Sequence, residues 1–237
     1  MSLTPTLTPT SKLMTTTTKL SHSFSSTELF ETCPKQYHAR YVEKSIKSED
    51  SAESLAGTRD HKSLENRLLD GSPLPPHLAK HEDKCDLIVN SGFIVKPEQE
   101  LAINKELEPC EWWDSDVILR VKADVALYSE TTAALLDWKT GKRRPKPFQL
   151  ELGALAQWIH YPKIKQTEAA FLWLRDDTTD RETYTRELDF DRILNKFKSK
   201  VERIEEAKEE GVWQAKPGYH CNWCGLKDTC TSSQARR

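Results

Sequence analysis

An apolar segment that ends in a pair of opposite charges constrains the fold of this chain more than any other feature. Residues 135–139 read Leu-Leu-Asp-Trp-Lys and lead directly into the turn Thr140-Gly141-Lys142. Because side chains alternate along a strand, Asp137 and Lys139 are expected to leave the sheet on the same face. A carboxylate can hold a hard cation, and a neighbouring ammonium can orient a water or neutralise charge on a phosphate. The pair therefore suits phosphodiester hydrolysis.

Other residues could complete a metal site around Asp137. Asp124 interrupts an apolar segment upstream, and two adjacent strands could bring both aspartates to one ion. His61 shares a helical face with Gly57, Leu64 and Leu68. A histidine in such a stripe is more often a core residue than a ligand, but here acidic partners are available. Glu98 or Glu100 could add another carboxylate, although charged residues before a strand are ordinarily solvated.

These residues resemble the motifs of RecB-type nucleases of the PD-(D/E)xK superfamily. The similar positions are Gly57-x-x-x-His61 on a helix, Asp124 on a middle strand, Asp137-x-Lys139 at the end of the next strand, and Gln149 at the start of a helix. The chain departs from the family pattern at Val121, where a glycine is frequent, and at Gly153, where a tyrosine often follows the glutamine.

The resemblance implies a metal-dependent nuclease site. It implies that Mg²⁺ or Mn²⁺ is bound by His61, Asp124, Asp137 and the backbone carbonyl of Trp138. The same resemblance implies that the catalytic residues are Asp124, Asp137, Lys139 and Gln149. A divalent ion held by a few carboxylates keeps positions open for water and phosphate.

Three cysteines near the C-terminus, Cys221, Cys224 and Cys230, form a C-x₂-C-x₅-C motif. Thiols this close together seldom arise by chance in a chain without signs of an oxidising compartment. A tetrahedral zinc site or an iron–sulfur cluster needs a fourth ligand. Cys33 is the candidate, because Pro34 after it fits the first position of a helix and leaves the cysteine at the helix start.

One cysteine before the nuclease motifs and three after them resemble the iron–sulfur subgroup of RecB-like nucleases. That subgroup includes CRISPR-adaptation exonucleases and the AddB recombination subunit. The resemblance implies a [4Fe–4S] cluster that joins the two ends of the chain through Cys33, Cys221, Cys224 and Cys230. Zn²⁺ is the alternative, and His220 is compatible with it. Cys85 and Cys110 are expected to be ordinary thiols.

The composition indicates one soluble globular domain. The chain has 237 residues, of which 37% are hydrophobic and 30% charged, and its net charge of −2 excludes a protein that is basic throughout. No apolar run approaches the roughly 18 residues of a membrane span. We predict a flexible Thr/Ser-rich tail at 1–22, a nuclease domain at 23–210 and a cysteine-rich cap at 211–237. We expect a cytoplasmic location, in a bacterial, archaeal or phage-infected cell.

Positive charge is concentrated in the loop after Lys139. This loop contains Lys142, Arg143, Arg144 and Lys146 and no acidic residue. Beside the nuclease motif it is predicted to bind a DNA backbone, whereas by itself it would be read as a solvated turn. Trp112, Trp113 and Trp138 are secondary candidates for base stacking, and Trp158 and Trp173 are expected in the core.

Periodicity predicts an α/β protein, and the order of its elements matches the α-β-β-β-α-β core that the resemblance to the PD-(D/E)xK (restriction-endonuclease-like) superfamily implies. The helices are expected at 26–32, 34–43, 53–69, 75–89, 148–160 and 190–210. The strands are expected at 101–106, 117–128, 133–139 and 169–174, with a further edge strand at 183–188.

The leading interpretation is a metal-dependent DNA exonuclease that acts on single strands or frayed ends. It would serve recombination, repair, replication or CRISPR adaptation, with a helicase, recombination or CRISPR integration enzyme as partner. The alternative is a non-catalytic DNA-binding or assembly module that keeps a nuclease fold. The presence of His61, Asp124, Asp137 and Lys139 together favours the enzyme, because a retired site would be free to lose at least one of them.

Overall fold

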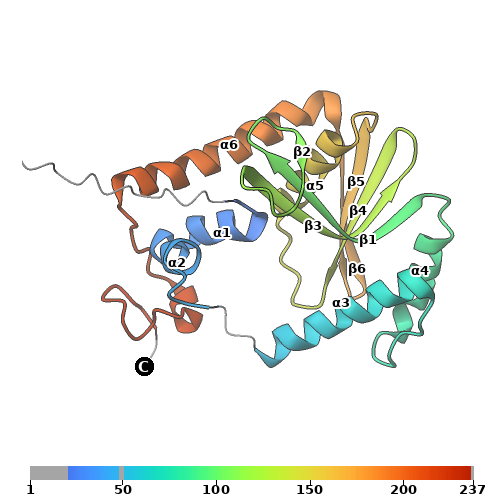
Figure 1. The fold of residues 1–237 in the computed structure, drawn as a ribbon. Helices are drawn as coiled ribbons and strands as arrows, with labels where there is room; N and C mark the ends of the chain where they lie inside the picture. The colour runs from blue at the N-terminus through green and yellow to red at the C-terminus, as the bar shows by residue number, and fades with distance from the viewer. Residues whose placement is uncertain (1–20, 48–50, 236–237) are drawn as a thin grey trace, which may run out of the picture.

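The fold is organised around one mixed β-sheet (Figure 1). The computed structural model describes residues 21–47 and 51–235, and its sheet has six strands in the order β2-β1-β3-β4-β5-β6. The strands are β1 (Ile94–Asn104), β2 (Pro109–Cys110), β3 (Val117–Tyr128), β4 (Thr132–Lys139), β5 (Gln166–Trp173) and β6 (Thr178–Thr185). Neighbouring strands are antiparallel except β4 and β5, which are parallel.

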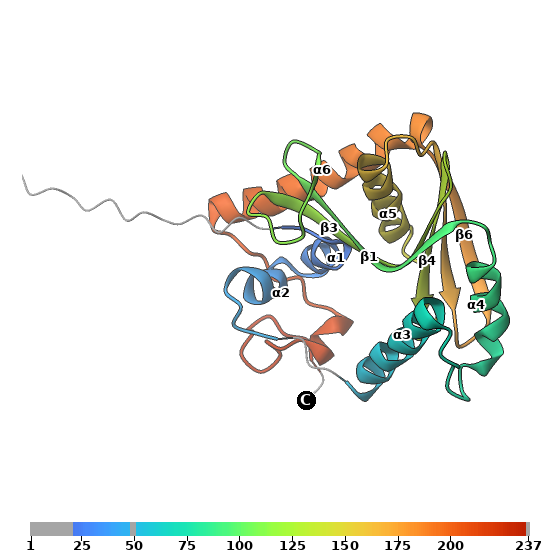
Figure 2. The ribbon, with the colours of Figure 1, turned by 45° about the vertical axis from the view of Figure 1, so that its right-hand side comes forward.

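Helix α5 (Pro147–His160) makes the crossover that the parallel pair β4 and β5 requires. It is buried along most of its length and packs against the sheet (Figure 2). Gly153 permits the close approach, because a Cβ there would lie 2.5 Å from Cδ1 of Leu135 in β4. Helix α6 (Arg186–Glu210) covers α5 from outside. The buried carboxylate of Glu151 in α5 accepts hydrogen bonds from Arg192 and Lys196 of α6, at 2.6 Å each.

The opposite face of the sheet is covered by α3 (Ala52–Asp70) and α4 (Glu82–Val89), with the 3₁₀ turn η2 (Ala79–His81) before α4. Their apolar side chains form a cluster with Trp138 of β4 and with Val125 of β3. Ala123 and Ala126 of β3 instead pack on the α5 side. Side chains three positions apart on a regular strand lie on opposite faces of the sheet. Because Ala123 and Ala126 pack on the same face, the alternation of side chains along β3 is interrupted between them, where Asp124 lies.

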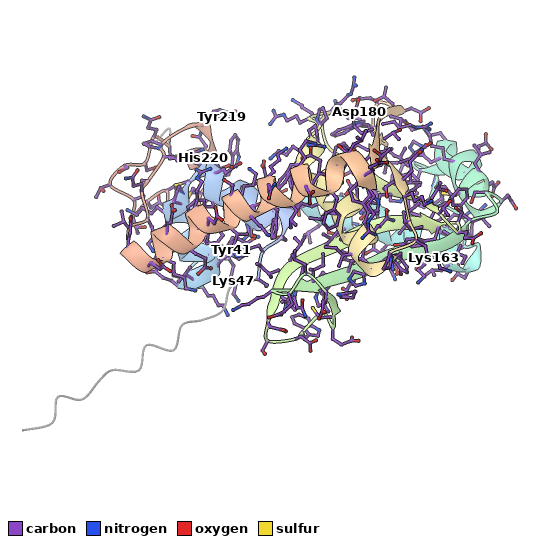
Figure 3. The ribbon with its side chains drawn as sticks, turned by 90° about the horizontal axis from the view of Figure 1, so that it is seen from above. Tyr41, Lys47, Lys163, Asp180, Tyr219 and His220 are labelled. Carbon is purple, nitrogen blue, oxygen red and sulfur yellow. The ribbon has the colours of Figure 1, made fainter. Side chains whose placement is uncertain are left out.

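A smaller lobe joins the two ends of the described chain. It contains α1 (Phe24–Thr32), α2 (Pro34–Tyr37), the π-helical turn η1 (His38–Val42), and the C-terminal segment with η3 (Tyr219–Trp223). Trp213 stacks on His38 with ring centroids 4.7 Å apart and contacts Tyr37 at 5.9 Å. Figure 3 looks onto α6, which runs between the part of the molecule that holds Asp180 and the lobe that holds Tyr219 and His220.

The predicted order of elements is confirmed: α3, β1, β3, β4, α5 and β5 follow one another as an α-β-β-β-α-β core, and β6 lies at the sheet edge. Two boundaries were wrong. β1 begins at residue 94 rather than 101, because its polar first half pairs only with β3, and an exposed edge tolerates Pro97 and charge. The strand expected at 183–188 ends at Thr185, where the carboxylate of Asp189 accepts the backbone N–H of Thr185 and α6 begins.

Other boundaries differ as well, and β6 begins at Thr178 rather than at 183. The helix expected at 34–43 is divided into α2 and the π-helical turn, and the helix expected at 75–89 becomes regular only at Glu82. Most of the tail predicted at 1–22 lies outside the described residues, but His22 forms a β-bridge with Leu119 and is buried. None of the helices in residues 21–47 and 51–235 combines the length and hydropathy needed to cross a bilayer.

Candidate active site

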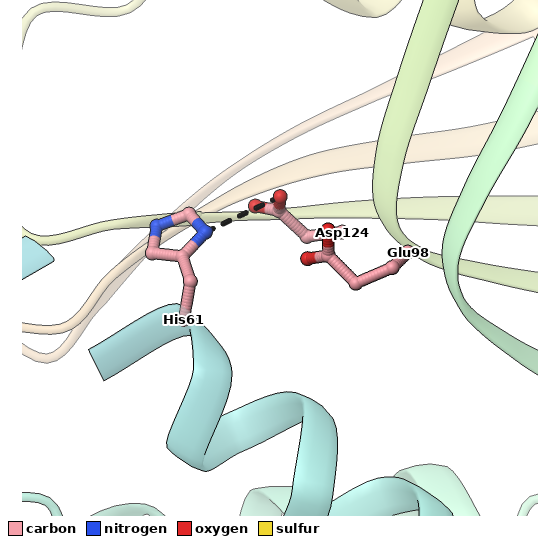
Figure 4. Close-up of side chains that lie close together, drawn as sticks. All are labelled: His61, Glu98 and Asp124. Atoms are coloured by element: carbon pink, nitrogen blue, oxygen red, sulfur yellow. Dashed lines mark ion pairs between the residues drawn. The ribbon is translucent and has the colours of Figure 1, made fainter. Parts of the chain in front are cut away.

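Three potential metal ligands from three different elements meet beside the sheet (Figure 4). They are His61 of α3, Glu98 of β1 and Asp124 of β3, and in the described part of the chain theirs are the ligand atoms that all lie within 4.8 Å of one another. His61 Nδ1 lies 3.3 Å from Asp124 Oδ1. An imidazole nitrogen and two carboxylates form a donor set that suits a divalent cation.

Of the two glutamates that could add a carboxylate to the metal site, Glu98 lies in the metal-ligand group and Glu100 does not. Glu98 lies opposite Asp124 in the register of β1 and β3, and its φ of +50° is a left-handed conformation that side-chain-bearing residues seldom adopt. Such a conformation costs of order 1–3 kcal/mol and is found most often at functional sites. Glu100 keeps regular pairing with Lys122 and is exposed. The sequence could not reveal this difference, because a positive φ at glutamate has no sequence signal.

Asp137 lies next to this group in a separate polar network. Its Oδ1 accepts a hydrogen bond of 2.7 Å from Gln149 Nε2, and its Oδ2 lies 2.5 Å from Lys139 Nζ. Lys139 also donates to Gln149 Oε1 at 3.2 Å. The Trp138 backbone N–H donates to Asp124 Oδ2 at 2.7 Å and so ties the two halves of the site together. The structure thus brings the catalytic residues predicted from the sequence into one site.

The ligand set differs from the predicted one in composition. His61, Asp124 and Asp137 were expected to share the ion, whereas the compact group in residues 21–47 and 51–235 contains Glu98 in place of Asp137. Asp137 Oδ2 is buried and accepts no well-oriented hydrogen bond despite the nearby ammonium. This oxygen therefore keeps lone pairs that an ion beside Asp124 could use.

Gly57 brings α3 to the site. A Cβ at this position would lie 2.9 Å from Thr140 Oγ1 in the turn after β4. That distance is too short for a real contact, so a larger residue would require the Thr140 side chain to move, whereas glycine lets the helix approach the turn without this shift. His61 lies one helical turn further on the same face. The spacing of glycine and histidine is thus explained by packing of α3 against the turn.

Comparison with protein families supplies the identification. The family model described as the PD-(D/E)XK nuclease superfamily matches residues 21–117 and 92–231. The chain belongs to the PD-(D/E)XK nuclease superfamily. A comparison with curated protein sequences finds no match. The mixed sheet with its crossover helix is thus that of a nuclease-superfamily domain.

The comparison with solved structures gives matches at low sequence identity, among them the following three. SSO0001 is 16% identical, with a TM-score of 0.48, and 92% of this chain and 90% of that chain are covered. A protein assigned as an exonuclease, from Eubacterium rectale, is 12% identical with a TM-score of 0.49, and the coverage is 89% and 90%. The alkaline exonuclease from Laribacter hongkongensis is 12% identical with a TM-score of 0.28, and the coverage is 69% and 89%.

Several carboxylates lie close together in this site, and their charges shift the pKa values of its residues. Burial raises the pKa of Asp137 to about 6, helped by the charge of Asp124 and opposed by Lys139. Burial tends to lower the pKa of His61, but the hydrogen bond and charge of Asp124, with two further carboxylates, raise it overall. The site therefore carries excess negative potential that a cation would relieve.

This electrostatic cost predicts that Asp137→Asn stabilises the metal-free protein while it removes the function of the site. A carboxyl whose pKa is raised on folding stabilises the fold fully below its unfolded pKa, near 3.8, and that contribution is lost as pH rises through about 6. In EDTA at pH 7.5 we expect the variant to gain about 1–3 kcal/mol of unfolding free energy, since one pKa unit corresponds to ~1.4 kcal/mol.

Urea denaturation at two pH values measures this effect. The stability difference between Asp137→Asn and wild type should be large at pH 7.5 and small at pH 4.5. A difference that is independent of pH would contradict the electrostatic origin.

The basic loop after β4 is partly neutralised within the molecule. Arg143 forms an ion pair with Asp180 of β6. Lys146 Nζ lies 2.8 Å from Glu28 Oε2 of α1 and 5.7 Å from the ring centroid of Phe24. Lys142 and Arg144 are exposed. DNA binding by Lys142, Arg143, Arg144 and Lys146 stays a prediction, and Arg143 and Lys146 would have to compete with their acidic partners.

The tryptophans divide between core and surface. Trp138 is 2% exposed, so the suggestion that it stacks on a base was wrong; its side chain packs with α3 and α4 instead. Trp158 and Trp173 are buried in the core, as expected. Trp112 and Trp113 lie on the loop between β2 and β3, at the rim of a cavity beside the active site.

The predicted cysteine ligands line one small cavity in the lobe, namely Cys33, Cys221, Cys224 and Cys230. Cys33 precedes Pro34 at the start of α2, as predicted. Backbone N–H groups donate to the sulfurs of Cys33, Cys221 and Cys224 at 3.4–3.5 Å. Within the described chain, however, no three thiols place their sulfurs within 4.8 Å of one another. The structure therefore gives four free thiols around a common cavity and no compact single-ion site.

Two of the thiols in this cavity have shifted pKa values. Hydrogen bonds from the backbones of Gln234 and Gly218 lower the pKa of Cys221. Burial, assisted by charges on the other cavity thiols, raises the pKa of Cys224. Cys85 and Cys110 lie outside this cavity and are free thiols, as expected.

Proposed function

We propose that the protein is a metal-dependent DNA exonuclease that acts on single strands or frayed ends. The observation that carries this proposal is the meeting of His61, Glu98 and Asp124 within 4.8 Å beside the Asp137–Lys139 pair. This arrangement places cation ligands, an additional carboxylate and a fixed ammonium at one location, which is what phosphodiester hydrolysis requires.

The residues fit Mg²⁺ or Mn²⁺. Two carboxylates and one imidazole offer hard or borderline donors, and Asp137 Oδ2, which lies 2.5 Å from the Lys139 ammonium, has further lone pairs for an ion. The carbonyl of Trp138 stays a further candidate ligand. When bound, the ion would supply charge stabilisation at the phosphate and would lower the pKa of a water.

Lys139 is proposed to hold the attacking water or a phosphate oxygen. Its ammonium is positioned by Asp137 at 2.5 Å and by Gln149 at 3.2 Å, and it lies 5.2 Å from the ring centroid of Phe171. Because three neighbours fix the ammonium before substrate arrives, no reorganisation is needed when charge develops on the phosphate. Gln149 orients Asp137 and Lys139 together through its amide.

Cleavage of end-labelled linear and circular single-stranded DNA tests the proposal. We expect loss of the linear substrate alone in Mn²⁺, no cleavage in EDTA, and none by Asp137→Ala. Cleavage of the circle would replace the exonuclease with an endonuclease. DNA binding without cleavage in any metal would favour the non-catalytic assembly module.

The choice between Glu98 and Glu100 gives a second expected result. Glu98→Gln should weaken Mn²⁺ binding at least tenfold, because it removes a charged ligand from the group. Glu100→Gln is the matched control on the same strand and should bind as wild type does. Isothermal titration with Mn²⁺ measures both, and equal affinities for the two variants would remove Glu98 from the ligand set.

We also propose that Cys33, Cys221, Cys224 and Cys230 hold a [4Fe–4S] cluster, with Zn²⁺ as the alternative. In a tetrahedral zinc site, Zn–S bonds of ~2.3 Å put the sulfurs about 3.8 Å apart. Among the described residues no three of these sulfurs lie within 4.8 Å of one another, but all four thiols line one cavity. The backbone N–H groups directed at three sulfurs would stabilise thiolates and tune a cluster.

The proposed exonuclease function also leads us to propose a wider biological setting. A nuclease domain at 23–210 and a cysteine-rich cap at 211–237 would work in the cytoplasm on DNA strands opened by another enzyme. A helicase, recombination or CRISPR integration partner would supply those ends, in recombination, repair, replication or CRISPR adaptation.

A further inference from the structure

A cavity of about 500 Å³ lies on the side of the active site away from His61. Asp137 and Gln149 of the catalytic network form part of its wall, and Lys122 lines both this cavity and the pocket that holds the metal-ligand group. Its size falls within the ~300–1,000 Å³ range of small-ligand pockets. The cavity therefore borders the catalytic network and the pocket of the metal-ligand group.

Two tryptophans and an arginine form the outer rim. The guanidinium of Arg120 lies 5.3 Å from the ring centroid of Trp113 and 5.7 Å from that of Trp112. Arg120 is held in place because its Nε donates to the Trp112 carbonyl at 2.7 Å and its terminal nitrogen donates to Ser21 Oγ at 2.6 Å. Trp113 is 83% exposed, so its ring is available to a ligand.

The rim and the wall have complementary chemistry for one class of ligand. Indole faces stack on nucleobases of any sequence, and the positive charge of Arg120 suits a phosphate beside the base. Lys122 would add to this charge only by leaving its ion pair with Glu98, whose Oε2 lies 2.6 Å from Lys122 Nζ. A base within a duplex has both faces covered by neighbours and its edge covered by its partner. Only an unpaired base could present a free face to Trp113 while its phosphate approaches Asp137.

We propose that this cavity receives an unpaired nucleobase of single-stranded DNA next to the scissile phosphate, with Trp113 as its stacking platform. This proposal rests on the proposed nuclease function and deepens it, because it makes strand separation at the cleavage point a requirement of the protein's own shape. A duplex would bind only where its end has opened.

Binding to short single-stranded oligonucleotides in EDTA tests the cavity without any need for cleavage. A set of six-nucleotide strands carries one abasic position, moved stepwise along the strand. We expect one or two abasic positions to weaken binding to the wild-type protein about tenfold, the loss of one stacked base. Trp113→Ala should weaken binding of the intact strand by a similar factor and lose the discrimination between intact and abasic strands.

Two further variants make the result specific to stacking. Trp113→Phe keeps an aromatic face and should retain most of the discrimination. Leu188→Ala removes a different exposed apolar side chain, at the start of α6, and should bind as wild type does. Circular dichroism checks that each variant is folded.

The proposal is overturned if Trp113→Ala weakens intact and abasic strands equally, or if no abasic position matters in the wild type. Its failure is distinguishable from failure of the nuclease proposal. If the protein binds intact strands more tightly than abasic strands in EDTA but cleaves no DNA, the base cavity is supported and the nuclease proposal fails. If it cleaves DNA with metal but binds intact and abasic strands equally, the nuclease proposal is supported and the base cavity fails.

Discussion

Lys139→Met should reduce the rate of single-strand cleavage by two to three orders of magnitude and leave Mn²⁺ affinity close to that of the wild type. Removing one preorganised charge from an active site typically costs 10²–10³ in rate. Lys139 is such a charge, because Asp137 and Gln149 fix its ammonium. The metal-ligand group does not include it. Methionine keeps much of the aliphatic chain that packs near Phe171, so the fold should persist.

Single-turnover cleavage at saturating DNA and Mn²⁺ titration measure the two quantities. Lys163→Met is the matched control, since Lys163 is exposed and follows the C-terminal end of α5, whereas Gln149 lies at the N-terminal end of that helix. A Lys139→Met variant that cleaves at the wild-type rate would remove the lysine from the mechanism. A variant that loses Mn²⁺ binding as well would indicate that Lys139 supports the ligand geometry instead.

The comparison of sequence and structure separates what periodicity encodes from what only tertiary contacts decide. Asp124 and Asp137 lie on adjacent antiparallel strands, and the register Val125 to Leu136 places them one step beyond the last paired residues. Alternation predicted that Asp137 and Lys139 share a face, and their ion pair agrees with it. These relations depend on local pattern and strand order, which a sequence carries.

The role of Glu98 depends on information that the sequence does not carry. Its position in a charged stretch indicated solvent, and its left-handed backbone and its place opposite Asp124 follow from pairing with β3. Similarly, Arg143 was predicted to bind a DNA backbone, but β6 brings Asp180 into an ion pair with it. Long-range partners of surface charges are set by the assembled sheet, so local patterns predict them poorly.

Loss of the cysteine site should produce the largest change in stability. Cys33 and Cys221 are 188 positions apart (221 − 33), and a cross-link across that length corresponds to about 5 kcal/mol in the chain-entropy model. The lobe is also held by Trp213, His38 and Tyr37, so part of this constraint exists without a cluster. We therefore expect Cys224→Ala to lose bound iron and about 2–5 kcal/mol of unfolding free energy, which corresponds to a fall in Tm of ~5–15 °C for a chain of this size.

Anaerobic purification, iron and sulfide analysis, and thermal denaturation test this expectation. Cys110→Ala is the matched control, because that half-buried thiol lies outside the cavity. Bound zinc without iron in the wild type would replace the cluster with its alternative. If Cys224→Ala keeps the metal content and the Tm of the wild type, both the iron–sulfur cluster and the zinc site are ruled out. Because the cysteine cavity lies in the lobe and shares no lining residue with the metal-ligand pocket, the folded variant should still cleave DNA well below its Tm. A constraint of this kind fixes the chain ends without taking part in the reaction.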